Sequence, residues 1–80
     1  MDDSKVLRHI SELTEEERQL EEGQVGEALA AHQLERLRAI EVELDRCWDL
    51  LRQRRARRSA GQDPDQATER PASVVERYQQ

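Results

Sequence analysis

Two stretches of helical hydrophobic periodicity, separated by a pair of glycines, limit the possible folds of this sequence more than any other feature. Apolar side chains in residues 4–22 recur in coiled-coil-like steps of three and four, interrupted only by Glu17, at Val6, Ile10, Leu13 and Leu20. Glycine is unfavourable inside a helix and common where helices end. The sequence therefore predicts a helix over residues 4–22 and a turn over residues 23–26, which includes Gly23 and Gly26.

The second stretch contains neither proline nor glycine and predicts a longer helix over residues 27–59, roughly 48 Å in length. Its apolar seam is formed by Leu34, Leu37, Leu44, Trp48 and Leu51, with Ile40 and Cys47 on its flank. Helices joined by a short loop pack antiparallel. Counting outward from the turn places Ile10 beside Ile40 and Val6 beside Leu44, so that residues from Trp48 onward extend past the first helix.

The remaining residues, 61–80, form a C-terminal tail to the hairpin domain of residues 1–60. Gly61 suits the left-handed conformation that often follows a helix. After Pro71 we expect a short helix over residues 72–78, with Val74, Val75 and Tyr78 on one side of it. Two interpretations of the tail stay open: a docked segment that covers the end of the long helix, and a frayed terminus.

The chain has few large apolar residues for its size, because only 35% of its 80 residues are hydrophobic. Chains this small usually need an additional source of stability, and oligomerisation is the one that remains here. We therefore expect an all-α protein, an antiparallel two-helix hairpin that assembles as a homodimeric four-helix bundle. The residues expected at its interface are Trp48, Leu51, Leu44, Val74, Val75 and Tyr78.

Charge is unevenly distributed along this acidic chain, whose formal net charge is -5. A basic segment near the end of the long helix comprises Arg52, Arg54, Arg55, Arg57 and Arg58. Positive charge complements the dipole at a helix C-terminus, so a solvated helix end is the favoured interpretation. Contact with nucleic acid through these arginines is the alternative, although the run has no stacking aromatics. A third interpretation is that these arginines contact an acidic protein surface, such as the first helix of a second copy.

Few residues of the sequence suggest a catalytic or metal-binding site. His9 and His32 each stand three residues before a glutamate, whereas di-metal carboxylate bundles use the order Glu-x-x-His. The single cysteine, Cys47, has no histidine near it in the sequence and is expected to be a small buried hydrophobe. We therefore predict no catalytic, metal-binding or cofactor-binding residue and no enzymatic activity. Glu17 and Glu41, which lie on the apolar seams, either specify register or occupy exposed boundary positions.

The cellular setting is also constrained. The longest apolar run is four residues, Ala28 to Ala31, far short of the roughly 20 that a membrane span needs. The acidic start of the chain differs from the basic start of a secretory signal. One cysteine cannot form an intrachain disulfide and fits a reducing compartment. The expected location is the cytoplasm, with no membrane partner.

The stretch Glu41 to Ala56, E-V-E-L-D-R-C-W-D-L-L-R-Q-R-R-A, resembles the signature of a small actinobacterial protein family of unknown function. The chain start and residues 61–65 and 70–78 are similar to that family as well, while residues 23–33 depart from it. The resemblance implies a short cytoplasmic helical protein and adds no catalytic role. The favoured function is a non-enzymatic structural or protein–protein interaction module with an unidentified protein partner. The alternative is a nucleic-acid-associated accessory protein that uses the basic segment.

Overall fold

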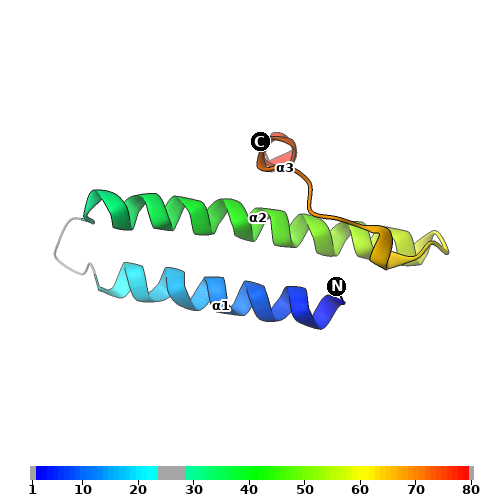
Figure 1. Ribbon diagram of the computed structural model, residues 1–80, viewed down its shortest axis with the longest axis horizontal. Coiled ribbons are helices and arrows are strands. Elements are labelled where there is room, and N and C mark those ends of the chain that lie inside the picture. The colour runs from blue at the N-terminus through cyan, green and yellow to red at the C-terminus, as the bar shows by residue number, and fades with distance from the viewer. Residues whose placement is uncertain (1, 24–28, 80) are drawn as a thin grey trace.

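The protein is a helical hairpin with a docked C-terminal segment. A computed structural model describes residues 2–23 and 29–79, the last three of these by their backbone alone. Its elements are α1 (Asp3–Glu22), α2 (Ala31–Ser59), the 3-10 helix η1 (Pro64–Gln66) and α3 (Ala72–Gln79). α1 and α2 run antiparallel along the length of the molecule (Figure 1). The described residues contain no strand, and the predicted all-α class is confirmed.

Local signals in the sequence account for the start of α1 and the end of α2. The Asp2 side chain accepts a hydrogen bond from the backbone N–H of Lys5 at 3.0 Å, as expected of an N-cap residue. Gly61 adopts φ 74°, and the next N–H, that of Gln62, donates to the Arg57 carbonyl at 2.7 Å. This pattern closes the last turn of a helix and requires a left-handed residue, which glycine provides without strain.

The start of α2 differs from the prediction. The helix begins at Ala31 rather than at residue 27, and Ala30 before it is extended, with φ -66° and ψ 154°. The Gln33 side chain accepts a hydrogen bond from the Ala30 N–H at 3.0 Å, which fixes the helix start at this position. Of the predicted turn, Gly23 ends α1 with φ -64°, while residues 24–26 lie outside the described residues, as do residues 27 and 28.

The longer connection changes the register of the hairpin. Arg36 of α2 donates to the Glu16 carboxylate at 2.7 Å, and His9 Nε2 lies 3.6 Å from Glu43 Oε1. Ile10 therefore lies level with α2 residues beyond Ile40, the partner that the sequence predicted. The predicted register was wrong because it assumed a second helix that begins immediately after the turn.

The apolar core shows which side of α2 faces α1. It contains Val6, Ile10 and Leu13 from α1 and Ile40, Cys47 and Leu50 from α2. The predicted seam is correct at three of its five positions. Its members Leu37, Leu44 and Leu51 are half-buried, but Leu34 and Trp48 are exposed at 36% and 45%. Ile40 and Cys47, which the sequence placed on the flank, are buried in their place.

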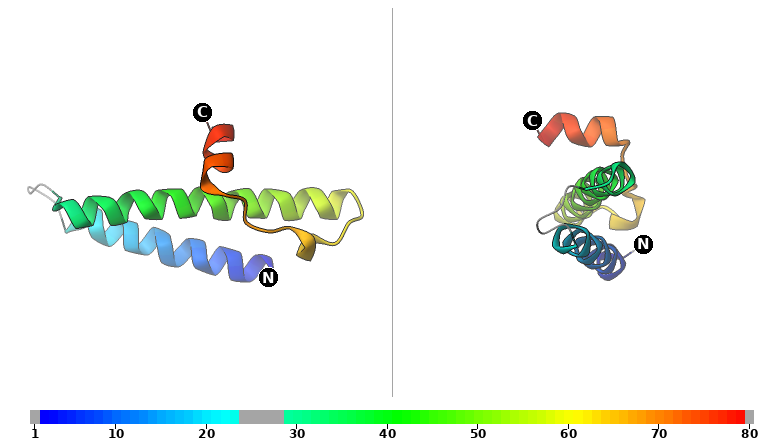
Figure 2. Two further views of the ribbon diagram at one scale, coloured as in Figure 1. Left: turned by 45° about the horizontal axis from the view of Figure 1, so that its top comes forward. Right: turned by 90° about the vertical axis from the view of Figure 1, so that its left-hand side faces the viewer.

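The C-terminal segment covers the end of α2 within the same chain. α3 crosses α2 on the side away from α1 (Figures 1 and 2), and Val75 is fully buried. Residues 64–67 return along the end of α2, where Leu51 and Ala67 pack against the hydrophobic core. Arg54 donates to Asp3 at the start of α1, so the prediction that Trp48 extends past that helix was wrong, although Trp48 is exposed. Of the two interpretations of the tail, the structure shows docking.

Candidate functional site

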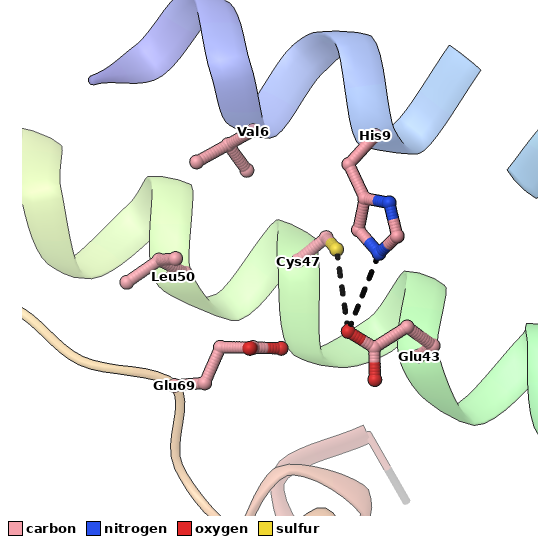
Figure 3. A pocket seen from close by; sticks show the side chains of 6 residues that line it. All are labelled: Val6, His9, Glu43, Cys47, Leu50 and Glu69. Atoms are coloured by element: carbon pink, nitrogen blue, oxygen red, sulfur yellow. Dashed lines mark hydrogen bonds and ion pairs between the residues drawn. The ribbon is translucent and has the colours of Figure 1, made fainter. Parts of the chain in front are cut away.

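A pocket of about 280 Å³ opens between α1, α2 and the segment that precedes α3. Three segments position its side chains: α1 contributes one turn, α2 contributes successive turns that face α1, and the segment before α3 contributes Glu69. Figure 3 shows the lining residues, which are Val6, His9, Glu43, Cys47, Leu50 and Glu69. Two apolar side chains thus close one end of a pocket whose other members can all bind a proton or a metal ion.

The polar members of the pocket lie close together. Glu43 Oε1 is 3.6 Å from His9 Nε2 and 4.0 Å from Cys47 Sγ, and the three atoms all lie within 4.8 Å of one another. No histidine is near Cys47 in the sequence, but the packing of α1 against α2 brings His9 to it. The available signal was weak: Glu43 and Cys47 are four apart on one helix face, and His9 adjoins the core residue Ile10.

Electrostatics in the pocket oppose ionisation of the thiol. Burial raises the pKa of Cys47 to about 11, and the negative charges of Glu43 and Glu69 act in the same direction. Burial, a hydrogen bond with Glu43 and the negative charge of Glu43 raise the pKa of Glu69. Arg46 lies between these carboxylates, 3.4 Å from Glu43 and 4.0 Å from Glu69. Cys47 is buried, as the sequence predicted, and at neutral pH its thiol is protonated and a poor nucleophile.

Buried polar groups on α2 hold the C-terminal segment. Asp49 is buried and accepts hydrogen bonds from Nε of Arg70 at 2.9 Å and from its Nη2. The Gln53 side chain donates to Asp49 at 3.0 Å and to the Thr68 carbonyl at 3.0 Å. The hydrogen bonds from Arg70 lower the pKa of Asp49, which keeps its carboxylate ionised. The sequence gave no sign of this cluster, because its partners are 15 to 21 residues apart.

The basic segment is divided between internal contacts and solvent. Arg54 is buried and donates to Asp3, to Asp65 at 3.0 Å and to the Pro64 carbonyl at 3.1 Å. Arg58 donates to Asp3 at 2.9 Å, and the hydrogen bonds from Arg58 and Arg54 lower the pKa of Asp3. The prediction of a solvated helix end is therefore wrong for Arg54, because α1 and η1 bring acidic partners to it. The others lie on the surface: Arg52 and Arg55 are exposed, and Arg57 is half-buried.

The predicted interface residues do not form one surface. Trp48 is exposed, Leu44, Leu51 and Val74 are half-buried, and Val75 is buried inside the chain. The side chain of Tyr78 lies outside the described residues. Of the two seam glutamates, Glu41 is exposed and Glu17 is half-buried. Trp48 is therefore the most exposed of the predicted interface residues whose side chains the structure describes.

Comparison with known proteins identifies the family. The family model described as "Protein of unknown function (DUF2630)" matches residues 2–80. The chain belongs to this family. Uncharacterized proteins from Mycobacterium tuberculosis and Mycobacterium bovis are each 50% identical to it over 80 residues, covering 95% of this chain and 88% of theirs. The predicted membership of a small actinobacterial family of unknown function is confirmed. No solved structure matches the chain.

The signature stretch of this family member, residues 41–56, supplies the α2 side of the pocket and the side chains that pair with the C-terminal segment. Its members line the pocket, hold the C-terminal segment and include Trp48. Within residues 2–23 and 29–79, no helix has both the length and the apolar character needed to cross a membrane. The same short stretch of α2 therefore contacts both α1 and the C-terminal segment in this DUF2630 protein.

Proposed function

We propose that the protein is a non-enzymatic interaction module that pairs with a second copy of itself through the side of α2 that carries Trp48. The observation that carries this proposal is the exposure of Trp48, 45%, between two buried neighbours, Cys47 and Asp49. Tryptophan is among the residues that contribute most to protein–protein interfaces. Exposed indole on a chain with so little apolar surface to bury supports a binding role for this side of the helix.

Trp48 lies on an edge of the hairpin where other apolar side chains gather. The His9–Glu43 and Glu16–Arg36 pairs mark one edge of the contact between α1 and α2. Each residue advances a helix by about 100°, which places Leu7 and Trp48 on the opposite edge. Leu7 is 47% exposed, and the half-buried Leu44 lies one turn from Trp48. This edge therefore offers an apolar strip beside the indole ring.

The charges around Trp48 favour a second copy as the occupant. Acidic and basic side chains lie on opposite sides of it along one stripe of α2, in the order Glu41, Asp45, Trp48, Arg52, Arg55. An antiparallel pair of α2 helices centred on Trp48 sets Glu41 against Arg55 of the second copy and Asp45 against its Arg52. A two-fold axis makes both sets of contacts at once. This pairing would unite two hairpins as the predicted four-helix bundle.

Two further observations support a non-enzymatic, cytoplasmic protein. The single thiol is buried and its raised pKa opposes nucleophilic use. A free cysteine also fits a reducing compartment.

The basic segment offers limited support for the nucleic-acid alternative. Two of its arginines pair with Asp3, so fewer remain to contact phosphates than that alternative assumed.

Sedimentation equilibrium at tens of micromolar tests the dimer. We expect wild type to be dimeric and Trp48→Ala to weaken association by roughly 2 kcal/mol or more, the cost typical of an interface anchor. Both proteins should retain the same helical content by circular dichroism, because Trp48 lies outside the core. A wild-type protein that remains folded and monomeric at this concentration would contradict the proposal.

A charge exchange tests the antiparallel arrangement. Glu41→Arg should weaken the dimer by placing like charges together, and the double variant Glu41→Arg with Arg55→Glu should restore it. Glu35→Arg is the matched control, since Glu35 is exposed on another side of α2. Equal weakening by Glu41→Arg and Glu35→Arg, without rescue by the double variant, would reject the pairing centred on Trp48.

A further inference from the structure

We propose that the pocket between α1, α2 and the segment before α3 is a transition-metal site, with His9, Glu43 and Cys47 as ligands of Zn²⁺. The proposal is independent of the dimer, because every ligand comes from one chain and lies on the edge away from Trp48. It adds a specific ligand to a pocket for which the sequence predicted none.

The distances between the donor atoms are close to those around zinc. Glu43 Oε1 lies 3.6 Å from His9 Nε2 and 4.0 Å from Cys47 Sγ. Bond lengths of about 2.0–2.3 Å in a tetrahedral site put neighbouring ligand atoms about 3.3–3.8 Å apart. Small side-chain rotations would therefore bring all three atoms into contact with one ion. Figure 3 shows His9 and Cys47 both directed toward the Glu43 carboxylate.

The backbone holds these ligands on two packed helices. Glu43 and Cys47 are one turn apart on the same face of α2, and His9 comes from the facing side of α1. The adjoining Val6 and Leu50 belong to the hydrophobic core, which fixes the spacing of the two helices at this point. A site built on such elements needs little reorganisation on binding.

A fourth donor is already present in the pocket. Glu69 lines it from the segment before α3, and Arg46 is 4.0 Å from its carboxylate. Arg70, the next residue, is anchored to the buried Asp49, which keeps Glu69 near the pocket. Three protein ligands with Glu69 or a water as the fourth match the four-coordinate geometry that Zn²⁺ adopts.

The charge and softness of the donors select the metal. Glu43 and Glu69 place two carboxylates beside one guanidinium, that of Arg46, so a divalent cation would relieve their repulsion. Imidazole and thiolate ligands favour Zn²⁺ and related transition metals over Mg²⁺ and Ca²⁺, which prefer oxygen alone. On binding, Cys47 would release its thiol proton to solvent as the sulfur–metal bond forms.

Metal binding would join three segments that are distant in the sequence: α1, α2 and the C-terminal segment. Small chains without a disulfide often gain stability from a structural metal. The site would therefore act as a clamp on the hairpin and its tail. Zinc should raise the unfolding temperature of the full chain, and the increase should depend on His9 and Cys47.

Titration of the metal-free, full-length protein with Co²⁺, in a buffer with a non-thiol reductant, tests the site. We expect one Co²⁺ per chain, a thiolate-to-cobalt charge-transfer band in the near ultraviolet, and loss of that band when Zn²⁺ displaces Co²⁺. His9→Gln and Cys47→Ala should each weaken binding at least about tenfold, the lower end of the cost of losing an outer-shell partner. Cys47→Ala should also abolish the band.

The controls separate the site from surface histidine and from dimerisation. His32→Gln changes an exposed histidine outside the pocket and should leave affinity and spectrum unchanged. His9 is itself exposed, so His9→Gln should retain the helical fold even where Cys47→Ala loses stability. Trp48→Ala should bind Co²⁺ as wild type does. Absence of the band in wild type, or equal affinity of wild type and His9→Gln, would overturn the proposal.

Discussion

α2 is covered on two sides by different chemistry. Toward α1 it presents Ile40, Cys47 and Leu50, which pack against apolar side chains. Toward the C-terminal segment it presents the buried Asp49, which pairs with Arg70, and the buried Arg54, which pairs with Asp65 as well as with Asp3 of α1. Among the described residues of that segment, Val75 alone is a fully buried apolar side chain.

The contact of α2 with α1 and its contact with the C-terminal segment respond differently to amino-acid substitution. Apolar packing has no directional requirement, so its contribution follows the area buried and the volume filled. A buried ion pair is different, because removing one partner leaves the other charge desolvated and uncompensated. The hairpin therefore depends on the size of its core side chains, and the docking of the tail depends on the integrity of individual pairs.

The largest effect is expected in the apolar core. Ile40→Ala removes a side chain with no exposed surface and should lower the free energy of unfolding by about 2–5 kcal/mol. Leu34→Ala, on the same helix but 36% exposed, should change it by roughly 0.5 kcal/mol or less. Urea unfolding followed by circular dichroism measures both. If Ile40→Ala does not fold, Ile40→Val should still cost about 0.5–1.5 kcal/mol. Equal effects of Ile40 and Leu34 variants would show that the core is misassigned.

A smaller effect is expected where α2 holds the tail. Arg70→Gln leaves the Asp49 carboxylate buried without its charged partner and should cost about 1–3 kcal/mol. Hydrogen exchange of residues 72–76 should accelerate while that of α1 is retained, since α1 packs through the separate apolar core. Arg38→Gln, at an exposed position of α2, is the control. Uniform acceleration throughout the chain would mean that hairpin and tail unfold as one unit.

The pH dependence distinguishes two carboxylates of this second contact. The pKa of Asp49 lies below 3.8 in the folded protein, so its stabilisation is complete above pH 3.8 and is lost as the pH falls through the lowered pKa. The pKa of Glu69 is raised above 4.5 in the folded protein. Ionised Glu69 therefore lowers the free energy of unfolding above its raised pKa, and protonation on acidification toward pH 4.5 restores it. Unfolding free energy should therefore rise on acidification toward pH 4.5 and fall below pH 3.8.

Glu69→Gln isolates the first half of that profile. Glutamine does not titrate, so the rise toward pH 4.5 should be smaller in this variant, while the fall below pH 3.8 should remain. Urea unfolding at a series of pH values measures both limbs. An unchanged rise in Glu69→Gln would show that Glu69 is not its source.

The smallest effect is expected at the exposed pair that links α1 to α2. Arg36→Gln breaks its contact with Glu16, where both side chains are largely solvated, and should cost about 0.2–1 kcal/mol. The loss should shrink at high salt, because solvent ions screen exposed charges. A cost as large as that of Arg70→Gln would erase the distinction between exposed and buried pairs on which this comparison depends.

Several elements of the fold were accessible from sequence because their signals are local. The capping of α1 by Asp2 and the end of α2 at Gly61 follow from the backbone needs of helix termini. The antiparallel hairpin follows from two amphipathic stretches with a short connection. Prediction failed where two patterns overlapped: Leu37, Leu44 and Leu51 belong equally to a seam with Trp48 and to one with Cys47. Periodicity alone cannot choose between faces that share half of their residues.

The candidate site was inaccessible for a related reason. His9, Cys47 and Glu69 come from three segments, and their proximity depends on the register of α1 against α2 and on the path of the tail. Neither quantity is contained in residue spacing. The same holds for Arg54, whose burial depends on Asp3 and Asp65 being brought to it.

The sequence by itself determined that this chain forms helices, where α1 starts and α2 ends, and that its apolar surface is scarce, because these properties depend on neighbouring residues and on composition. The tertiary structure decided the register of the hairpin, the buried face of α2, the docking of the tail and the pocket around Cys47. Each of these depends on which distant groups satisfy one another. Burying the charge of an aspartate or arginine is strongly unfavourable unless a group of opposite charge lies beside it. Whether such a group lies there depends on the tertiary structure.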